Sequence, residues 1–332
     1  MAANLTVSVI IVNWNGADHL RICLPSLGSQ SLKPLEIIVV DNCSSDDSED
    51  VAKHFGIRWL PLELNVGLAP ALNRGAKAAR GDLLLFVNND MRFDPGFVAA
   101  LAQPLETDHL MFATDGMQLD WEGTHRGHMA TRLSDVLRNR TPFTELVPGL
   151  YFYAEPKMEK TFVFMASAAC MMVRKTLFEN LGGFDDRLPL GYEDTEICWR
   201  AWVRGLKTLY VPTAICWHRV GGSARSLEAQ RFGFRGVLTG RLLLATKYLS
   251  ARFAFRTWLV SIAGLAKDLT GFRWKLAFDR IGVLVRMAGL VPGLLKEKQI
   301  LFGKAGTSPD KQLKFLLQLT NEDRPSQLVS PN

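Results

Sequence analysis

The chain has 332 residues, 48% of them hydrophobic and 22% charged, which fits a packed globular protein of one large domain or one domain with an appendage. Its five cysteines are odd in number, scattered and without a C-x-x-C pair, which argues against a disulfide framework or a structural zinc site and favours a reducing compartment. The amino-terminal run MAANLTVSVIIVNWN lacks a basic start and a cleavage site and is too short to span a membrane, so we expect a strand there and a cytoplasmic protein.

The net charge of +6 conceals an uneven distribution along the chain. Residues 1–218 carry 20 Lys and Arg against 26 Asp and Glu, residues 219–304 carry 16 against 4, and residues 305–332 carry 3 against 3. A basic block of this size indicates a polyanionic partner, either a nucleic acid or an anionic membrane surface. Because Leu, Phe and Trp fill the spaces between the charges, we favour the membrane surface and expect no nucleic-acid partner.

The first ninety residues alternate between apolar runs and amphipathic stretches. The apolar runs contain no regular polar positions, which is typical of strands covered on both faces and predicts a mostly parallel sheet with crossover helices. The fold class is therefore α/β, and polar residues follow the strand ends where such a sheet binds ligands. The predicted strands are residues 7–12, 35–41, 57–62 and 83–87, and the predicted helices are residues 17–27, 48–55 and 69–79.

Regular patterns are weaker in the middle of the chain. Residues 110–160 show few clear periods, so we expect loops that face a substrate. The later predicted elements are an apolar run at 162–173, a helix from Lys175, a turn at Gly182 and Gly183, a helix over 194–205 and a strand over 208–212. Basic amphipathic helices follow from Arg219 to Lys304, and a polar tail follows from Ala305.

The run LLLFVNND, Leu83 to Asp90, joins a buried strand directly to three polar residues. Such a strand end lies where open α/β sheets bind ligands, and the oxygens of Asn88 and Asp90 suit a divalent cation that carries phosphates. A polar turn after a core strand explains the same residues without any ligand. The segment alone leaves both interpretations open.

Two further segments contain candidate catalytic groups. Glu193 and Asp194 stand at a predicted helix start, where capping is a sufficient reason for carboxylates. A long loop containing Gly and Pro leads to them, however, and a carboxylate pair delivered on such a loop suits a general base. His218 follows a predicted strand, although a single His beside a Trp is more often a core or surface residue than a ligand.

The segments around the first and third predicted helices bear on nucleotide binding. NVGLAPALNRG, residues 65–75, allows close approach of the backbone to a ligand, or forms only a turn and a cap. After the first strand the chain has Asn13-Trp14-Asn15-Gly16 in place of a Gly-x-Gly-x-x-Gly fingerprint, which disfavours an NAD or FAD enzyme. These residues also lack the basic, Gly-rich phosphate loop expected of a sugar-1-phosphate nucleotidyltransferase.

Taken in order, seven segments resemble the inverting family 2 glycosyltransferases of the GT-A fold, and within them the bacterial rhamnosyltransferase-like and galactofuranosyltransferase-like branch. The segments are VSVIIVNWN, VVDNCSSDDS, NVGLAPALNRG, LLFVNNDM, ASAACMMVRK, GGFDDRLPLGYEDTEICWRAWVRGLK and the later His218. One block would be weak evidence, whereas seven in family order are specific. The resemblance covers residues 5–225 and weakens in the basic region.

The resemblance implies a role for each matching residue. Asn88 and Asp90 occupy the metal-binding Asp-x-Asp position and His218 matches a third ligand, which implies Mg²⁺ or Mn²⁺ as cofactor. Because Asn88 replaces the first Asp with a neutral oxygen, Asp90 has to supply most of the charge. Asp194, with Glu193 beside it, matches the general base. Donor binding is implied for Trp14 and Asp41, at the positions that hold the base, and for Asn13, Asn15, Asn65, Gly67, Asn73 and Asn89.

The implied reaction moves a sugar, with rhamnose as the best guess, from a nucleoside diphosphate sugar to a hydroxyl of a glycan or lipid-linked acceptor. The product would belong to cell-surface polysaccharide. The alternative is a catalytically inactive protein of the same fold that binds sugar nucleotides or acts as a scaffold at the membrane, which the Asn88 substitution would also fit.

We expect a catalytic domain over residues 1–225, a basic helical region over 226–304 and a polar tail over 305–332. The helical region has no uncharged stretch of about 18 residues, so we expect it to lie in the interface of the inner face of the cell membrane without crossing it. The alternative is a helical bundle that packs on the catalytic domain or on a second subunit. Packing on a second subunit would make the protein a homo-oligomer.

Overall fold

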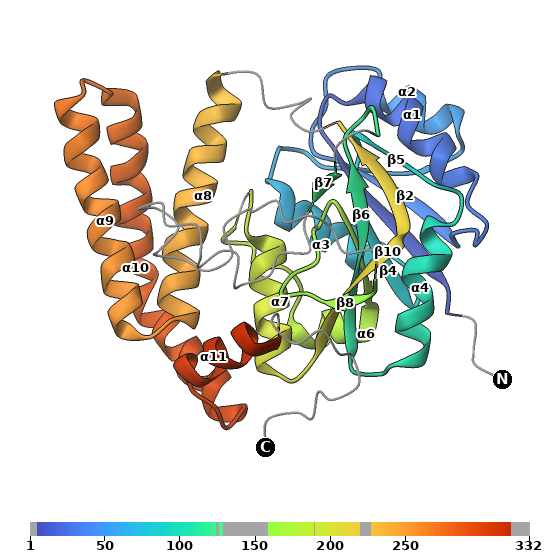
Figure 1. The fold of residues 1–332 in the computed structure, drawn as a ribbon. Helices are drawn as coiled ribbons and strands as arrows, with labels where there is room; N and C mark the ends of the chain where they lie inside the picture. Colours follow the sequence, from blue (N-terminus) through green and yellow to red (C-terminus); the bar gives the residue numbers. More distant parts are fainter. Residues whose placement is uncertain (1–4, 124–125, 129–158, 189, 220–226, 320–332) are drawn as a thin grey trace.

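The computed structural model describes residues 5–123, 126–128, 159–188, 190–219 and 227–319. A central sheet with helices on both faces forms one part of the molecule, and long helices stand beside it as a bundle (Figure 1). The sheet has the strand order β3-β2-β1-β4-β9-β6-β10-β5, with β7 paired to β6 and β8 paired to β10. The predicted α/β fold class and the helical C-terminal region are confirmed.

The first part of the sheet is parallel, as the unbroken apolar runs predict. β1 lies between β2 and β4, and β3 extends the sheet beyond β2. The strands are β1 (Val7–Asn13), β2 (Glu36–Asp41), β3 (Arg58–Pro61) and β4 (Leu83–Asn88), and the crossover helices are α1 (Ala17–Gly28), α2 (Ser48–His54) and α3 (Leu68–Ala78). Each boundary lies within one residue of the predicted one.

The second part of the sheet is mixed. β9 runs antiparallel between β4 and β6, and β10 runs parallel to β6, so β10 has the same direction as β4. The carboxyl ends of β1, β2, β4 and β10 therefore meet at one edge. The strands of this part are β5 (Met91–Phe93), β6 (Met111–Leu119), β7 (Arg126–His128), β8 (Thr161–Phe162), β9 (Cys170–Arg174) and β10 (Lys207–His218).

The prediction of loops from residue 110 is wrong for β6, which is a buried strand in the middle of the sheet. Thr114, Asp115 and Gly116 interrupt its apolar pattern, although all three are buried. Helix α4 (Phe97–Thr107) precedes it, and α6 (Lys175–Leu181) and α7 (Glu193–Val203) follow later in the chain. Residues 129–158 of the predicted loop region lie outside the described residues.

Two apolar cores lie on the two faces of the sheet. On one face, Leu20 of α1 and Leu101 of α4 pack with the β-strands. On the other, Phe86 of β4 belongs to one cluster with Trp199 of α7 and Leu243 of the first bundle helix. The bundle therefore shares one apolar core with the sheet and α7 and has no separate core of its own there.

The bundle consists of α8 (Leu227–Tyr248), α9 (Ala251–Thr270) and α10 (Trp274–Lys304), followed by α11 (Pro309–Leu319). Helix α9 runs antiparallel to both α8 and α10 (Figure 1). Helix α11 occupies the first part of the segment that we expected to be a polar tail. Among the helices that the structure describes, none combines the length and apolar composition needed to cross a membrane.

Candidate active site

Polar residues at the strand ends gather at one edge of the sheet. Asn13 pairs in register with Asp41 across β1 and β2, and Val12 pairs with Asn88 across β1 and β4. At the other side of this edge His218, the last residue of β10, lies opposite Met91 of β5. The sequence predicted this convergence, whereas the roles of the individual residues stay predictions.

Asn13 is buried and connects two neighbouring loops. Its Nδ2 donates to Ser44 Oγ at 3.2 Å and to Asp41 Oδ1 at 3.4 Å, and its Oδ1 accepts from Asn89 Nδ2 at 2.8 Å. Asp41 accepts a further hydrogen bond from the Ser44 backbone N–H at 3.0 Å. These contacts fix the positions of three predicted donor-binding residues before any ligand arrives.

Trp14 is 45% exposed at this edge, so its ring is available for stacking on a planar group. The turn that presents it is held by Asn15, which has a left-handed backbone with φ of 50°. Asn tolerates this conformation better than most residues, and here its Oδ1 accepts from the Ser45 N–H at 2.7 Å. Its own N–H donates to Ser44 Oγ at 2.8 Å. The loop after β2 therefore determines where the indole lies.

Asn42 organises the loop before α3 and was missed in the sequence. Its Nδ2 donates to Asn65 Oδ1 at 2.9 Å and to Gly67 O at 3.2 Å, while its Oδ1 accepts from the Val66 N–H at 2.9 Å. Gly67 has φ of 89°, which a residue with a side chain rarely adopts. The available signal was its place directly after Asp41, at the end of a predicted parallel strand.

Asn73 has a different environment from the other predicted donor-binding residues. Its Nδ2 donates to Phe184 O at 2.9 Å and to Asp186 Oδ1 at 2.7 Å, and its Oδ1 accepts from the Phe184 N–H at 2.9 Å. The side chain thus anchors the loop that leads to α7 on helix α3. Its amide is occupied by these contacts.

The three predicted metal ligands lie together. His218 Nε2 is 3.2 Å from Asp90 Oδ1 and 3.4 Å from Asn88 Nδ2. Asp90 and His218 are largely buried, so a charge on either one is poorly solvated. Across the described ranges no three His, Cys, Asp or Glu side chains form a cluster of their own, so a metal here would need the amide oxygen of Asn88 as third ligand. The amide would then have to turn, because Nδ2 is the atom that faces His218.

Gln118 of β6 sets the tautomer of His218 and was not predicted. Its Oε1 lies 3.2 Å from His218 Nδ1, and because a carbonyl oxygen only accepts, Nδ1 must carry the hydrogen. In the neutral ring Nε2 then presents a lone pair toward Asp90, and two acceptors at this distance need a proton or a cation between them. This donor set and its outer partner fit Mg²⁺ or Mn²⁺.

The carboxylate pair lies at the amino end of α7. Asp194 Oδ1 accepts from the Thr195 N–H at 2.6 Å, whereas Glu193 Oε2 is buried and has no hydrogen-bond partner within the described part of the chain. Burial raises the pKa of both groups, and the charge of Asp194 helps to raise the pKa of Glu193 to about 8. At neutral pH Glu193 therefore keeps its proton.

Two adjacent residues connect the predicted metal ligands to the carboxylate pair. The Asn88 N–H donates to Ala169 O at 3.1 Å, and the Ala168 N–H donates to Asp194 Oδ2 at 3.4 Å. Asp194 therefore lies close to the end of β4 although it is more than a hundred residues away along the chain. The structure brings together all the predicted catalytic and metal-binding groups.

Comparison with known proteins identifies the family. The sequence profile described as Glycosyl transferase family 2 matches residues 8–182, just over half of the chain. The chain belongs to glycosyl transferase family 2. The enzyme class predicted from the sequence is thereby confirmed: the protein is a glycosyltransferase.

Two curated relatives extend over more of the chain. An N-acetylglucosaminyl-diphospho-decaprenol L-rhamnosyltransferase of Mycobacterium tuberculosis is 26% identical over 230 residues, which cover 63% of this chain and 75% of that protein. The O-antigen biosynthesis protein RfbC of Myxococcus xanthus is 29% identical over 232 residues, which cover 66% of this chain and 18% of that protein. The first relative agrees with the rhamnosyltransferase-like branch expected from the sequence.

Solved structures with the same fold confirm the GT-A architecture of this glycosyltransferase. GalNAc-T7 with UDP, GalNAc and Mn²⁺ superposes with a TM-score of 0.58 at 19% identity, over 82% of this chain and 55% of that one. The mannosyltransferase PcManGT from Pyrobaculum calidifontis, in complex with GDP-Man and Mn²⁺, has a TM-score of 0.52 at 16% identity, over 86% and 87% of the two chains.

Proposed function

We propose that this glycosyltransferase moves a sugar with inversion from a nucleoside diphosphate sugar to an acceptor hydroxyl. One observation supports the proposal most directly: Asn88 and Asp194 form hydrogen bonds with two adjacent residues, Asn88 with Ala169 and Asp194 with Ala168. An inverting transfer needs a group that receives the diphosphate on one side of the sugar and a base on the other. Two such groups held by neighbouring residues would act on the same bound sugar.

On the diphosphate side, Asp90, His218 and Asn88 would hold Mg²⁺ or Mn²⁺. When bound, the metal supplies Lewis-acid stabilisation of the charge on the departing diphosphate. The fit of the donor set supports this assignment, because His218 Nε2 and Asp90 Oδ1 face each other at 3.2 Å. The role of Gln118 is to keep the Nε2 lone pair directed at the site.

On the acceptor side, Asp194 receives the proton of the attacking hydroxyl. The Thr195 and Ala168 N–H groups hold its two oxygens, so the carboxylate has a fixed orientation. Glu193, protonated at neutral pH, adds no second negative charge beside the base. Asp194 is therefore the base and Glu193 is its neutral neighbour, because burial and mutual repulsion disfavour two negative charges side by side.

Donor recognition is assigned to the other half of the edge. Trp14 would stack on the nucleobase and Asp41 would bind its ring, since the first is exposed and the second is fixed by Ser44. Asn65 and Gly67 would approach the sugar and phosphates at the start of α3. The remaining assignments to the donor site are Asn13, Asn15, Asn73 and Asn89.

Rhamnose is the proposed sugar and a lipid-linked glycan the proposed acceptor. The name of the mycobacterial relative, a rhamnosyltransferase that acts on a decaprenol-linked sugar, supports both. Such an acceptor belongs to the synthesis of cell-surface polysaccharide and would place the protein at the inner face of the cell membrane. Small changes in pocket contacts exchange one sugar for another, so the donor has to be measured.

The test is donor hydrolysis by the purified full chain with a panel of nucleoside diphosphate sugars, with Mn²⁺ or Mg²⁺ and with EDTA. We expect metal-dependent release of diphosphate from one donor. Asp194→Asn should lower turnover with acceptor about 10²- to 10⁴-fold while donor binding persists. Asp18→Asn, on the exposed surface of α1, is the matched control. Near wild-type turnover of Asp194→Asn would refute the base assignment.

A catalytically inactive sugar-nucleotide-binding protein is the second candidate, and Asn88 in place of a first Asp favours it. This candidate predicts donor binding in a thermal-shift assay without any hydrolysis or transfer. Detectable metal-dependent turnover of any donor in the panel rules it out.

A further inference from the structure

Helix α9 has apolar side chains on both its inner and its outer side. On the inner side Phe253, Trp258 and Val260 pack, partly buried, against the core. Its buried residues, Thr257, Ser261 and Asp268, are all polar. The exposed side carries large apolar side chains that recur every three to seven residues, and the most exposed is Phe255 at 68%. These residues are Phe255, Leu259, Ile262 and Leu269. A soluble helix keeps its outer side polar, so this apolar outer side indicates another partner.

Helix α10 continues the same surface after the turn. Its inner face is apolar and buried through Val283, Met287 and Leu294. Its outer face, which should be polar in a soluble helix, is apolar as well, with Phe278 71% exposed and Phe272 in the preceding turn 78% exposed. The exposed residues of this face are Trp274, Phe278, Ile281, Val285 and Leu295.

Cations border this apolar face and lack neutralising partners. The three carboxylates of residues 251–304 are all engaged elsewhere: Asp268 with Arg273 and Arg280, Asp279 with Arg231, and Glu297 with Lys247. No carboxylate of the described residues lies within ion-pair distance of the exposed cations. These cations are Arg252, Arg256 and Lys267 on α9, and Lys275, Arg286 and Lys296 on α10.

We propose that the outward face of the α9–α10 hairpin, residues 251–296, docks in the headgroup region of an anionic lipid bilayer. Apolar side chains would enter the boundary of the acyl chains while the bordering cations contact anionic headgroups. A second copy of the chain fits less well, because a two-fold contact through this face would bring the cations of both copies together. The docking surface itself does not depend on the proposed function. Only its link to a lipid-linked acceptor rests on that function.

The position of the hairpin relative to the site supports this link. The turn between α9 and α10 lies at the same end of the bundle as the start of α8 (Figure 1). In Figure 1 this end of the bundle points in the same direction as the carboxyl end of β10. The turn end of the hairpin therefore lies on the same side of the molecule as the carboxyl edge of the sheet.

The experiment measures sedimentation of the full chain with vesicles of phosphatidylcholine alone and with about one third phosphatidylglycerol. We expect binding to the anionic vesicles only, and at least a tenfold loss in the double variant Phe255→Glu/Phe278→Glu. The charge variant Arg252→Gln/Arg256→Gln/Lys275→Gln should lose binding in a salt-dependent way. Leu110→Glu, an exposed apolar residue before β6, is the control and should bind normally.

Each outcome separates this inference from the proposed function. Absent vesicle binding, or equal binding by the Phe255→Glu/Phe278→Glu variant, overturns the docking surface even if donor hydrolysis is intact. Vesicle binding without turnover of any donor leaves the surface in place and overturns the proposed function. If light scattering shows a dimer that the same double variant dissociates and vesicles do not bind, the face is an interface between two copies and the inference is wrong.

Discussion

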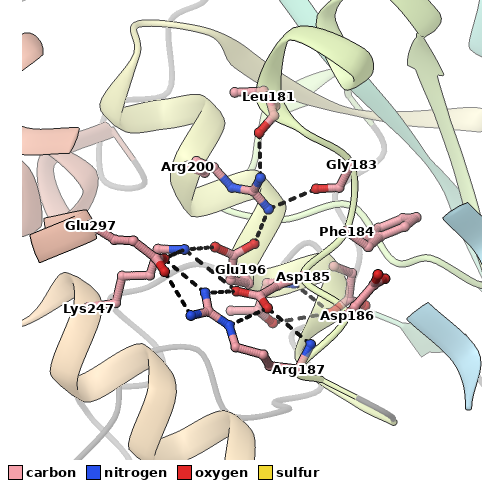
Figure 2. A network of polar contacts seen from close by, with 12 residues as sticks. Leu181, Gly183, Phe184, Asp185, Asp186, Arg187, Glu196, Arg200, Lys247 and Glu297 are labelled. Atoms are coloured by element: carbon pink, nitrogen blue, oxygen red, sulfur yellow. Dashed lines mark hydrogen bonds and ion pairs between the residues drawn. The ribbon is translucent and has the colours of Figure 1, made fainter. Parts of the chain in front are cut away.

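Lys247 Nζ of α8 lies 2.9 Å from Glu196 Oε1 of α7, two residues after the proposed base. The same ammonium group is 3.0 Å from Glu297 Oε2 and 3.6 Å from Asp185 Oδ2 (Figure 2). Arg187 bonds to both of these carboxylates, and Arg200 pairs with Glu196. Three cations and three carboxylates thus form one balanced network that joins the bundle to the helix carrying Asp194.

Replacement of Lys247 by Met should destabilise the protein strongly. Burial alone would raise the pKa of Glu196, but Arg200 and Lys247 lower it to about 2, so the carboxylate is charged inside the protein. Without Lys247 the network keeps an excess negative charge, and loss of one partner of a buried pair costs about 3–5 kcal/mol. Urea unfolding followed by circular dichroism measures the change in the free energy of unfolding.

The pH dependence of this variant gives a second readout. A carboxylate whose pKa is lowered on folding adds stability above its unfolded pKa and loses it as the pH falls toward about 2. The difference between wild type and Lys247→Met should therefore shrink between pH 5 and pH 3. Arg21→Met, which removes exposed pairs with Asp18 and Asp47, is the control and should change stability little. Equal effects of the two substitutions would refute the role of the buried network.

Gly236 of α8 allows the bundle to pack closely against the loop before α7. A Cβ at this position would lie 2.2 Å from the backbone oxygen of Leu190, three residues before Glu193. Gly236→Ala should therefore shift this loop, lower the free energy of unfolding by about 1–3 kcal/mol and reduce turnover more than donor binding. Gly233→Ala is a matched control on the same helix, since a Cβ there meets nothing within 4 Å.

The control substitution, Gly233→Ala, should change the stability in the opposite direction. In the open position Gly233→Ala should stabilise the helix by up to about 1 kcal/mol, because Ala loses less backbone entropy than Gly. Similar kinetic constants for Gly236→Ala and Gly233→Ala would show that α8 does not position the carboxylate pair. Steady-state kinetics with a soluble acceptor analogue and thermal unfolding provide both readouts.

The sequence predicted the parallel part of the fold because its strands are uninterrupted apolar runs. The segment from Leu83 to Val87 is fully buried, and its apolar sequence alone is enough to predict a strand. β6 could not be predicted in this way, because Asp115 and Gly116 lie in its middle. Asp115 is tolerated there because burial keeps its carboxyl group neutral, which is a tertiary effect that a local pattern does not contain.

The site was predictable only where the chemistry lies at strand and helix ends. Asn88, Asp90 and His218 were predicted as metal ligands from the sequence, and they lie together because each is at or just after a strand end on the same edge. Gln118 was missed because it lies within β6, where its side chain meets His218 only after the sheet has formed. The buried network of Lys247 could not be predicted either, since its six members come from four separated segments of the chain.

Gln118 provides a test of the metal site through a residue that would not touch the metal. Gln118→Met removes the acceptor for the His218 Nδ1 hydrogen, so the ring can adopt the other tautomer. Loss of such an outer partner lowers metal affinity about 10- to 100-fold. Gln118→Glu keeps an acceptor and should retain the affinity. Calorimetric titration with Mn²⁺ in the presence of nucleoside diphosphate measures both variants, and equal affinity of Gln118→Met and wild type would contradict the assignment.

Asp115 should make the protein less stable as the pH rises. Its carboxyl group is fully buried in β6, and Oδ2 has no hydrogen-bond partner in the described structure. Burial, followed by the neighbouring Cys170 and Asp194, raises the pKa well above its usual value. The folded protein therefore holds a proton that the unfolded chain releases. The stability is fully present below the unfolded pKa and falls by about 1.4 kcal/mol per pH unit until the folded pKa is reached.

Asp115→Asn removes this dependence while keeping the shape of the side chain and the acceptor for the Ser167 N–H, which donates to Asp115 Oδ1 at 3.3 Å. We expect the variant to match wild type near pH 4, close to the unfolded pKa, and to exceed its free energy of unfolding increasingly toward pH 8. Urea unfolding at several pH values measures this difference, and Asp18→Asn on the exposed surface is the control. Glu193 adds a slope of the same sign, but it is present in both proteins and cancels in the comparison. Parallel pH profiles of wild type and Asp115→Asn would mean that the Asp115 carboxyl is ionised in the folded protein.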